Sequence, residues 1–259
     1  MIGVFDSGVG GMTVASAIEQ VLPDKQLIYF GDLARAPYGS KSPETIRRYA
    51  IENTEFLISK GATLIIVACN SAASVASDIL QSTFDQPVFE VITPAIDRAI
   101  AVSRTGRIGV IGTRATIKSG VYEQEIKRKR TECKIFSEPC PMLVPLVEEG
   151  WLNKRETKMI TRRYLHPLKM KNVDTLLLGC THYPLLKHLI QPRIGKRVKV
   201  IDSSHEVAKR LHDFLESRPE LSRSLEKKTE NTYYVSDVTD AASMTAQRIF
   251  GRKIKLNKI

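Results

Sequence analysis

The sequence predicts an α/β fold made of two pseudo-symmetric, doubly wound halves whose parallel sheets face each other across a cleft. The first observation behind this prediction is a recurring unit. Short runs rich in Ile, Val, Leu and Phe are each followed by a turn of small residues and then by a helical pattern, which is typical of repeated βα units around a parallel sheet. The second observation is an internal duplication.

Three segments of the first half recur in the second half at nearly constant spacing. IGVFDSG, which begins at Ile2, matches IGVIGTR, which begins at Ile108, 106 residues later. LIIVACN, which contains Cys69, matches LLLGCT, which contains Cys180, 111 residues later. FEVITPA matches VKVIDSS 109 residues later. We therefore expect two halves of the same architecture.

The individual elements follow from hydrophobic patterning. Runs of aliphatic and aromatic residues predict strands, and longer periodic stretches predict helices. In the first half we expect strands at 2–5, 27–30, 63–68 and 88–91 and helices at 11–21, 43–59 and 71–81. In the second half we expect strands at 107–111, 134–136, 175–178 and 199–201.

The last part of the chain carries too little apolar sequence for a core of its own. It contains a helical stretch at 205–215, a charged segment at 216–230, a strand-like TYYVS from Thr232 and a helix at 241–249. We expect this tail to pack on the first half. The predicted domains are therefore 1–93 together with 205–259, and 94–204, with the active site between them.

Composition excludes several classes of protein. With 42% hydrophobic and 26% charged residues, the chain is neither disordered nor fibrous. Its longest apolar run, at 64–69, is far short of the roughly 20 residues that a membrane span needs. The N-terminal residues lack the basic region of a secretory signal. We expect a cytoplasmic protein that does not contact membranes.

The chain has few cysteines, and none of them stands in a CxxC motif. This spacing argues against a zinc ribbon, a redox motif or a disulfide framework, so we expect free thiols and no metal site. The four cysteines are Cys69, Cys133, Cys140 and Cys180.

The net charge of +11 suggests an anionic partner, such as a nucleic acid or an acidic small molecule. The basic clusters at 127–130, 193–199 and 252–258 contain no interleaved aromatic residues, so a solvated surface is the simpler interpretation. A basic nucleic-acid-binding module is kept as an alternative from a different functional class.

Ligands of parallel α/β sheets bind at the carboxyl ends of the strands. The glycine loop DSGVGG, which begins at Asp6, lies at such an end, but Thr13 occupies the position where a dinucleotide fingerprint needs glycine. We interpret the glycines as allowing close backbone approach to a small anionic ligand. The polar or small residues at the predicted strand ends are Asp6, Ser7, Asp32, Tyr38, Gly39, Cys69, Asn70, Ser71, Thr113, Cys180, Thr181 and His182.

The duplication places Cys69 and Cys180 at corresponding strand ends of the two halves. A lone buried cysteine is more often a small core residue than a nucleophile, and one thiol beside a histidine would indicate a cysteine hydrolase. Two thiols on opposite walls suit another reaction, in which one removes a proton from a carbon and the other delivers a proton to the opposite face. A helix N-terminus beside each thiol can lower its pKa. The pair favours racemisation without a cofactor.

Five motifs together resemble the cofactor-independent aspartate/glutamate racemase family. They are DSGVGG from Asp6, APYG from Ala36, ACNSAA from Ala68, PLVEEG from Pro145 and GCTHYP from Gly179, in the family's order and over nearly the whole chain. One departure is that Ser71 and Ala73 stand where the family commonly has Thr and Ser. Ser71 keeps a hydroxyl, so we expect substrate binding to survive.

The resemblance implies an enzyme that interconverts L- and D-glutamate and supplies D-glutamate for bacterial peptidoglycan. It implies that Cys69 acts on the D-enantiomer and Cys180 on the L-enantiomer, with Asp6 assisting the first thiol and His182, together with Glu148, the second. An aspartate racemase remains an alternative, because the sequence does not show how deep the substrate pocket is. We also expect a homodimer. The implied substrate contacts are Asp6, Ser7, Tyr38, Gly39, Asn70, Ser71, Thr181 and His182.

Overall fold

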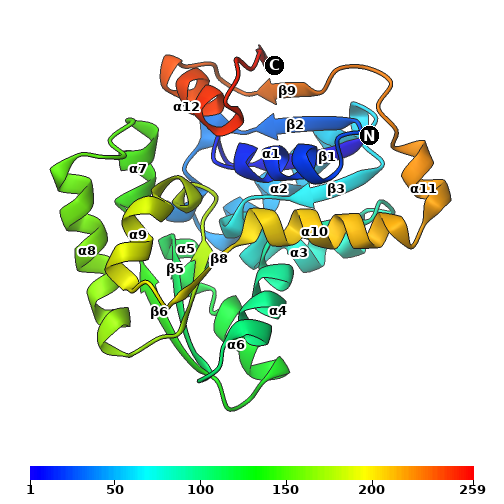
Figure 1. Cartoon of the computed structure of the whole chain (residues 1–259). Coiled ribbons are helices and arrows are strands. Elements are labelled where there is room, and N and C mark those ends of the chain that lie inside the picture. The colour runs from blue at the N-terminus through cyan, green and yellow to red at the C-terminus, as the bar shows by residue number, and fades with distance from the viewer.

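Two parallel sheets organise the computed structural model, which describes residues 1–259 (Figure 1). The first sheet has the strand order β10-β9-β2-β1-β3-β4 and the second the order β6-β5-β7-β8. The predicted α/β class is confirmed. The strands are β1 (Ile2–Asp6), β2 (Leu27–Gly31), β3 (Leu64–Val67), β4 (Val88–Glu90), β5 (Arg107–Gly112), β6 (Lys134–Pro139), β7 (Thr175–Gly179), β8 (Lys199–Asp202), β9 (Thr232–Val235) and β10 (Leu256–Lys258).

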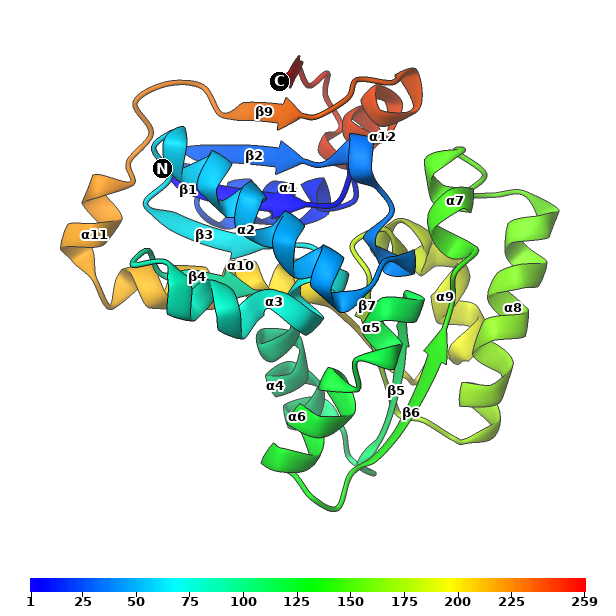
Figure 2. The ribbon, with the colours of Figure 1, turned by 180° about the vertical axis from the view of Figure 1, so that it is seen from behind.

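Helices cover both faces of each sheet, as the two opposite views show (Figures 1 and 2). On the first sheet, α1 (Met12–Val21) and α10 (Ser203–Glu216) lie on one face, and α2 (Pro43–Ser59) and α3 (Asn70–Thr83) on the other. On the second sheet, α4 (Ile92–Val102) and α6 (Val121–Lys129) lie opposite α8 (Arg155–Met170) and α9 (Lys187–Ile194). The remaining α-helices are α5 (Arg114–Lys118), α7 (Leu143–Glu148), α11 (Pro219–Ser224) and α12 (Asp240–Phe250), and short 3-10 helices span Leu33–Arg35, Tyr38–Ser40 and Tyr183–Leu186.

The central strands are buried along their whole length because helices cover both of their faces. All four residues of β3, LIIV, are buried, and so are all five of β7, TLLLG. This continuous burial explains why apolar runs, rather than alternation, mark these strands in the sequence.

The two sheets repeat one topology. The order β2-β1-β3-β4 in the first sheet corresponds to β6-β5-β7-β8 in the second. The register repeats as well: Phe5 pairs with Val67, and Ile111 pairs with Leu178, which are the positions that the shifts of 106 and 111 residues relate. Cys69 and Cys180 each come two residues after the second member of these pairs.

The tail extends the first sheet. β9 pairs with β2, and β10 pairs with β9, so the end of the chain forms one edge of the six-stranded sheet. The strand from Thr232 was predicted, but β10 was not, and the segment at 216–230, expected only as a charged segment, contains α11. Pro219 at the start of α11 suits a first helical turn, but no residue of that helix is buried, which removes the periodic signal. The domain boundaries at 93 and 204 stay a prediction.

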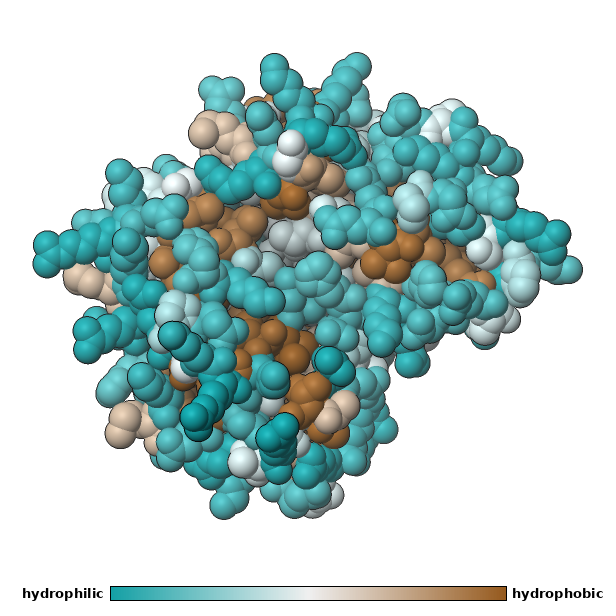
Figure 3. Space-filling model, viewed as in Figure 1, coloured by the Kyte–Doolittle hydropathy of each residue, from teal (hydrophilic) through white to brown (hydrophobic).

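The face shown in Figure 3 is mostly hydrophilic, and its apolar residues lie in several separate patches. None of the helices combines the length and the apolar character that crossing a bilayer requires.

Candidate active site

One cavity lies between the carboxyl ends of the two sheets, and both Cys69 and Cys180 line it. The space that the centres of water molecules can occupy inside it is about 30 Å³. All the strand-end residues predicted for the site, and Glu148, line this cavity except Asp6 and Asp32, which are both buried. The lining residues are Ser7, Gly8, Ala36, Pro37, Tyr38, Gly39, Cys69, Asn70, Ser71, Thr113, Val144, Glu148, Cys180, Thr181 and His182.

Cys69 caps the N-terminus of α3 and is 4% exposed. Its Sγ lies 3.6 Å from Oγ of Ser7, to which the thiol donates. Burial and the nearby carboxyl of Asp6 raise the pKa of Cys69 to about 12, against the lowering effect of the Ala72 and Ser7 contacts. Cys69 is therefore a protonated thiol at neutral pH, and the lowering of its pKa expected from the helix N-terminus is outweighed.

Asp6 joins the two halves from beneath the cavity. Its carboxylate accepts hydrogen bonds from the amide of Gly8, at 2.9 Å, and from Oγ1 of Thr181, at 3.3 Å. Burial raises the pKa of Asp6, although the charge on His182 and these hydrogen bonds oppose the shift. Asp6 thus lies close enough to Cys69 to influence its pKa and contacts the loop that carries Cys180.

Cys180 belongs to a short chain of titratable groups. Nδ1 of His182 lies 3.9 Å from Sγ of Cys180, and Nε2 lies 3.1 Å from Oε1 of Glu148. The distance between Nε2 and Glu148 is short enough for an ion pair, but the geometry is not that of a hydrogen bond, so Nε2 has no hydrogen-bond partner. Burial alone would lower the pKa of His182, but the contacts with Cys180 and Glu148 outweigh it and raise the pKa to about 10. A positive charge therefore lies beside Cys180 at neutral pH.

Two glycines allow close contact between the halves. A Cβ on Gly10 would lie 2.5 Å from the ring of His182, and a Cβ on Gly39 would lie 2.6 Å from Cβ of Thr113. Real Cβ atoms do not lie this close to other atoms, so an alanine at either position would force its neighbours to move. At both positions the nearest neighbours are side chains of the other half. The prediction that the glycines of the DSGVGG loop permit close approach to a small anionic ligand stays a prediction.

The hydroxyl groups of Ser71 and of Tyr38 in the APYG turn already have partners. Oγ of Ser71 lies 2.9 Å from Oγ1 of Thr113, so this pair also spans the two halves. The hydroxyl of Tyr38 donates to the carboxylate of Asp32 and accepts from Nδ2 of Asn53, which lies 3.0 Å away. The hydroxyl of Tyr38 is thus engaged inside the first half, while the residue itself lines the cavity.

Sequence reasoning missed Tyr122, whose hydroxyl donates to Oδ1 of Asn70 at 2.7 Å. Tyr122 lies on α6, 52 residues from Asn70, and no motif surrounds it. Val144 on α7, which lines the cavity beside Glu148, was missed as well. Both contacts depend on the packing of the second half, which a single sequence does not encode locally.

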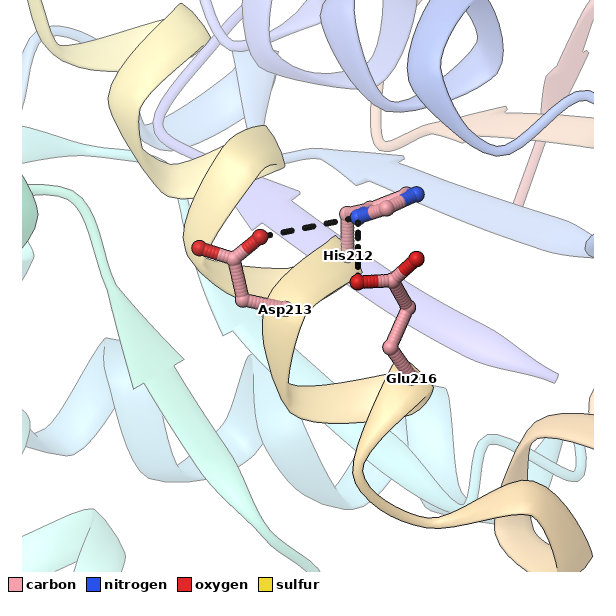
Figure 4. Close-up of side chains that lie close together, drawn as sticks. All are labelled: His212, Asp213 and Glu216. Atoms are coloured by element: carbon pink, nitrogen blue, oxygen red, sulfur yellow. Dashed lines mark ion pairs between the residues drawn. The ribbon is translucent and has the colours of Figure 1, made fainter.

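A cluster with the composition of metal ligands lies outside the cavity, on α10 (Figure 4). Nδ1 of His212 is 3.6 Å from a carboxylate oxygen of Asp213 and 3.7 Å from one of Glu216. Asp213 and Glu216 are exposed, and ordinary surface ion pairing accounts for the arrangement.

The basic cluster at 127–130 is largely neutralised by its neighbours. Lys127 and Arg128 pair with Glu123 and Glu125 on the same helix, and Lys129 pairs with Asp97. This arrangement is that of a solvated helix face.

Comparison with known proteins gives a consistent result. The family model Asp/Glu/Hydantoin racemase matches residues 12–211. A glutamate racemase of Geobacter metallireducens is 46% identical over 98% of this chain and 93% of its own length. The crystal structure of a glutamate racemase isoform from Bacillus anthracis has a TM-score of 0.92 at 36% identity, covering 100% of this chain and 97% of its own. A glutamate racemase from Francisella tularensis, solved in complex with D-glutamate, has a TM-score of 0.90 at 35% identity, covering 100% of this chain and 96% of its own.

An aspartate racemase homologue from Pyrococcus horikoshii is more distant. It has a TM-score of 0.59 at 18% identity, covering 83% of this chain and 98% of its own. The resemblance to that protein is one of fold alone.

Proposed function

The chain belongs to the Asp/Glu/Hydantoin racemase family and is an isomerase that interconverts L- and D-glutamate, and from this premise we propose that Cys69 and Cys180 are its two acid–base groups. The observation that carries the proposal is the shared cavity, which both cysteines line from equivalent strand ends of the two halves. Inverting a stereocentre needs a base on one face of the carbon and an acid on the other, and two opposed thiols supply both.

The two thiols work in alternation. In one direction, the thiolate of Cys180 removes the α-proton of L-glutamate, and the thiol of Cys69 delivers its proton to the opposite face. In the other direction, Cys69 acts as the base on D-glutamate and Cys180 as the acid. Each turnover moves one proton off the carbon and one onto it, so no oxidant and no cofactor is required.

The surroundings of the two thiols support these roles. His182 carries a positive charge 3.9 Å from Sγ of Cys180, where negative charge forms when that thiol gives up its proton. Glu148 holds His182 from its other side. Asp6 is buried, and its carboxyl raises the pKa of Cys69, which favours the protonated thiol that delivers a proton. We propose that His182 and Glu148 assist Cys180 and that Asp6 assists Cys69.

Glutamate carries two carboxylates, and the cavity offers polar groups and helix N-termini to bind them. Cys69 caps α3, so the first backbone amides of that helix lie beside the cavity and favour negative charge. We propose that the substrate contacts are Ser7, Tyr38, Gly39, Asn70, Ser71, Thr181 and His182, with Asp6 acting from below the cavity.

We place the reaction in the cytoplasm, with D-glutamate passing to the synthesis of cell-wall peptidoglycan. A homodimer stays a prediction, and a nucleic-acid-binding role stays the less favoured alternative. The second is tested by titrating duplex DNA at two salt concentrations, because binding through phosphates weakens steeply as salt rises.

Solvent exchange tests the proposal directly. Purified protein with L-glutamate in deuterated water should give D-glutamate that carries deuterium at the α-carbon, and exchange on aspartate should be far slower. Cys69→Ala and Cys180→Ala should each abolish turnover. Cys133→Ala is the matched control, since Cys133 is a buried free thiol that does not line the cavity. Near-normal racemisation by either active-site variant would remove the two-thiol mechanism.

A further inference from the structure

A buried amide nitrogen beside the cavity has no hydrogen-bond partner. Asn70 follows Cys69 directly, lines the cavity and is 2% exposed, and its Nδ2 is unpaired. Leaving a buried donor unsatisfied is costly, and such groups are rare in folded proteins. An unpaired donor such as Nδ2 of Asn70, on a residue that lines a ligand cavity, can donate a hydrogen bond to the ligand. The carboxylate of a bound amino acid is a matching acceptor.

The other end of the same amide is held from the opposite half of the molecule. The hydroxyl of Tyr122 donates to Oδ1 of Asn70 at 2.7 Å. Tyr122 is 3% exposed, so this bond is shielded from water. Burial, with a contribution from nearby Glu90, raises the pKa of Tyr122 well above its usual value, so the hydroxyl keeps its proton and remains a donor.

This bond selects one of the two orientations of the amide. If the amide were rotated by half a turn, Oδ1 would take the place of Nδ2 and would face the negative charge of the substrate. The hydroxyl of Tyr122 would then face an amide nitrogen and would lose its acceptor, because Asn70 is the partner that this hydroxyl has in the structure. Both effects oppose the rotation.

We propose that Tyr122 is a positioning residue for racemisation: it orients the side-chain amide of Asn70 so that Nδ2 donates to a carboxylate of the bound amino acid. The inference rests on the proposed function and deepens it, because it assigns a role to a residue that does not line the cavity. The position of Tyr122 on α6 means that the second half of the molecule orients a substrate contact of the first half.

Tyr122→Phe removes the hydroxyl and little else. Without it, the amide samples both orientations and loses part of one hydrogen bond to the substrate. We expect KM for glutamate to rise roughly three- to ten-fold, the factor that one hydrogen bond is worth. The maximal rate should change less than KM, because Cys69 and Cys180 are left in place.

A double-mutant cycle separates positioning from a general structural role. The kinetics of Tyr122→Phe, Asn70→Ala and the double variant are compared. If Tyr122 acts through the amide, its substitution has no further effect on KM once Asn70 is alanine. Tyr233→Phe is the matched control, because Tyr233 is also a buried tyrosine but its hydroxyl contacts Glu19, which does not line the cavity.

The outcomes distinguish the inference from the function on which it rests. If the unmodified protein fails to exchange the α-proton of glutamate, the proposed function is wrong. If it racemises glutamate and Tyr122→Phe leaves KM unchanged, or if the effects of the two substitutions add in the double variant, the positioning role is overturned. A rise in KM that vanishes in the Asn70→Ala background, with Tyr233→Phe unaffected, supports it.

Discussion

The imidazole of His182 lies between a thiol and a carboxylate, and this position has a consequence for stability. Its pKa is about 10 in the folded protein, whereas an unfolded histidine titrates near 6.5. The folded state therefore holds this proton more tightly. The resulting stabilisation is fully present below about pH 6.5 and is lost as the pH rises through about 10.

We expect the stability advantage of the unmodified protein over His182→Gln to shrink between pH 7 and 10. The slope should reach at most about 1.4 kcal/mol per pH unit, the value for one proton. Urea unfolding at several pH values measures it. His205→Gln, which removes a histidine whose side chain is 63% exposed, is the control. A difference that stays constant over this range would contradict the ion-paired His182.

At this scale the sequence located the residues that stand directly after strands, because the ends of parallel strands converge on one edge of a sheet. Cys69, Cys180 and His182 belong to this group, and the structure brings them to one cavity. Tyr122 lies inside a helix, and its contact with Asn70 depends on how α6 packs. No local sequence pattern predicts a contact of this kind.

At the scale of elements, the loop between β1 and α1 is shaped to meet the other half. Gly10→Ala would place a methyl group 2.5 Å from the ring of His182 and 2.6 Å from Oγ1 of Thr181. Because the loop is buried, the strain should cost roughly 1–3 kcal/mol of stability. Displacement of His182 should lower the turnover number roughly ten- to hundred-fold.

Thermal unfolding and racemisation assays of Gly10→Ala measure these two effects. Gly8→Ala is the control for stability, since the nearest atom to an added Cβ there is Oε1 of Glu148 at 4.0 Å. Equal stability of the two variants would show that the loop yields without strain, against our expectation.

The tail completes the first sheet, so we expect its removal to destabilise the protein strongly. A chain that ends at residue 230 lacks β9 and leaves the edge of β2 unpaired. An exposed, apolar edge strand is an aggregation hazard, and we expect this chain to be insoluble or to lose cooperative unfolding. A chain that ends at residue 254 lacks just β10, which pairs with β9 alone, and should fold with a lower melting temperature. Circular dichroism and size-exclusion chromatography test both.

Element boundaries were predicted best where burial is continuous. β3 was expected at 63–68 and spans Leu64–Val67, and α2 was expected and found at Pro43–Ser59. The short edge strand β10 and the exposed helix α11 escaped prediction. Both lie at the periphery, where few apolar side chains are buried and the hydrophobic pattern that marks an element is missing.

At the scale of the whole molecule, the topology followed from the internal duplication, but the width of the cleft did not. The cavity of about 30 Å³ holds roughly two water molecules, and glutamate is several times larger than a water molecule. The hydrogen bonds of Thr181 to Asp6 and of Ser71 to Thr113 hold the halves together around it. We infer that the two halves separate to admit the substrate.

Alkylation of the thiols tests this movement. Cys69 and Cys180 are 4% and 6% exposed, so iodoacetamide reaches them mainly when the halves separate. Bound D-glutamate should occupy the cavity and protect both thiols together, by roughly ten-fold at a ligand concentration ten times the dissociation constant. Cys133, which is 3% exposed but lies outside the cavity, should react at an unchanged rate. Mass spectrometry of the modified peptides gives all three rates, and protection of just one of the two active-site thiols would mean that they do not share a single substrate.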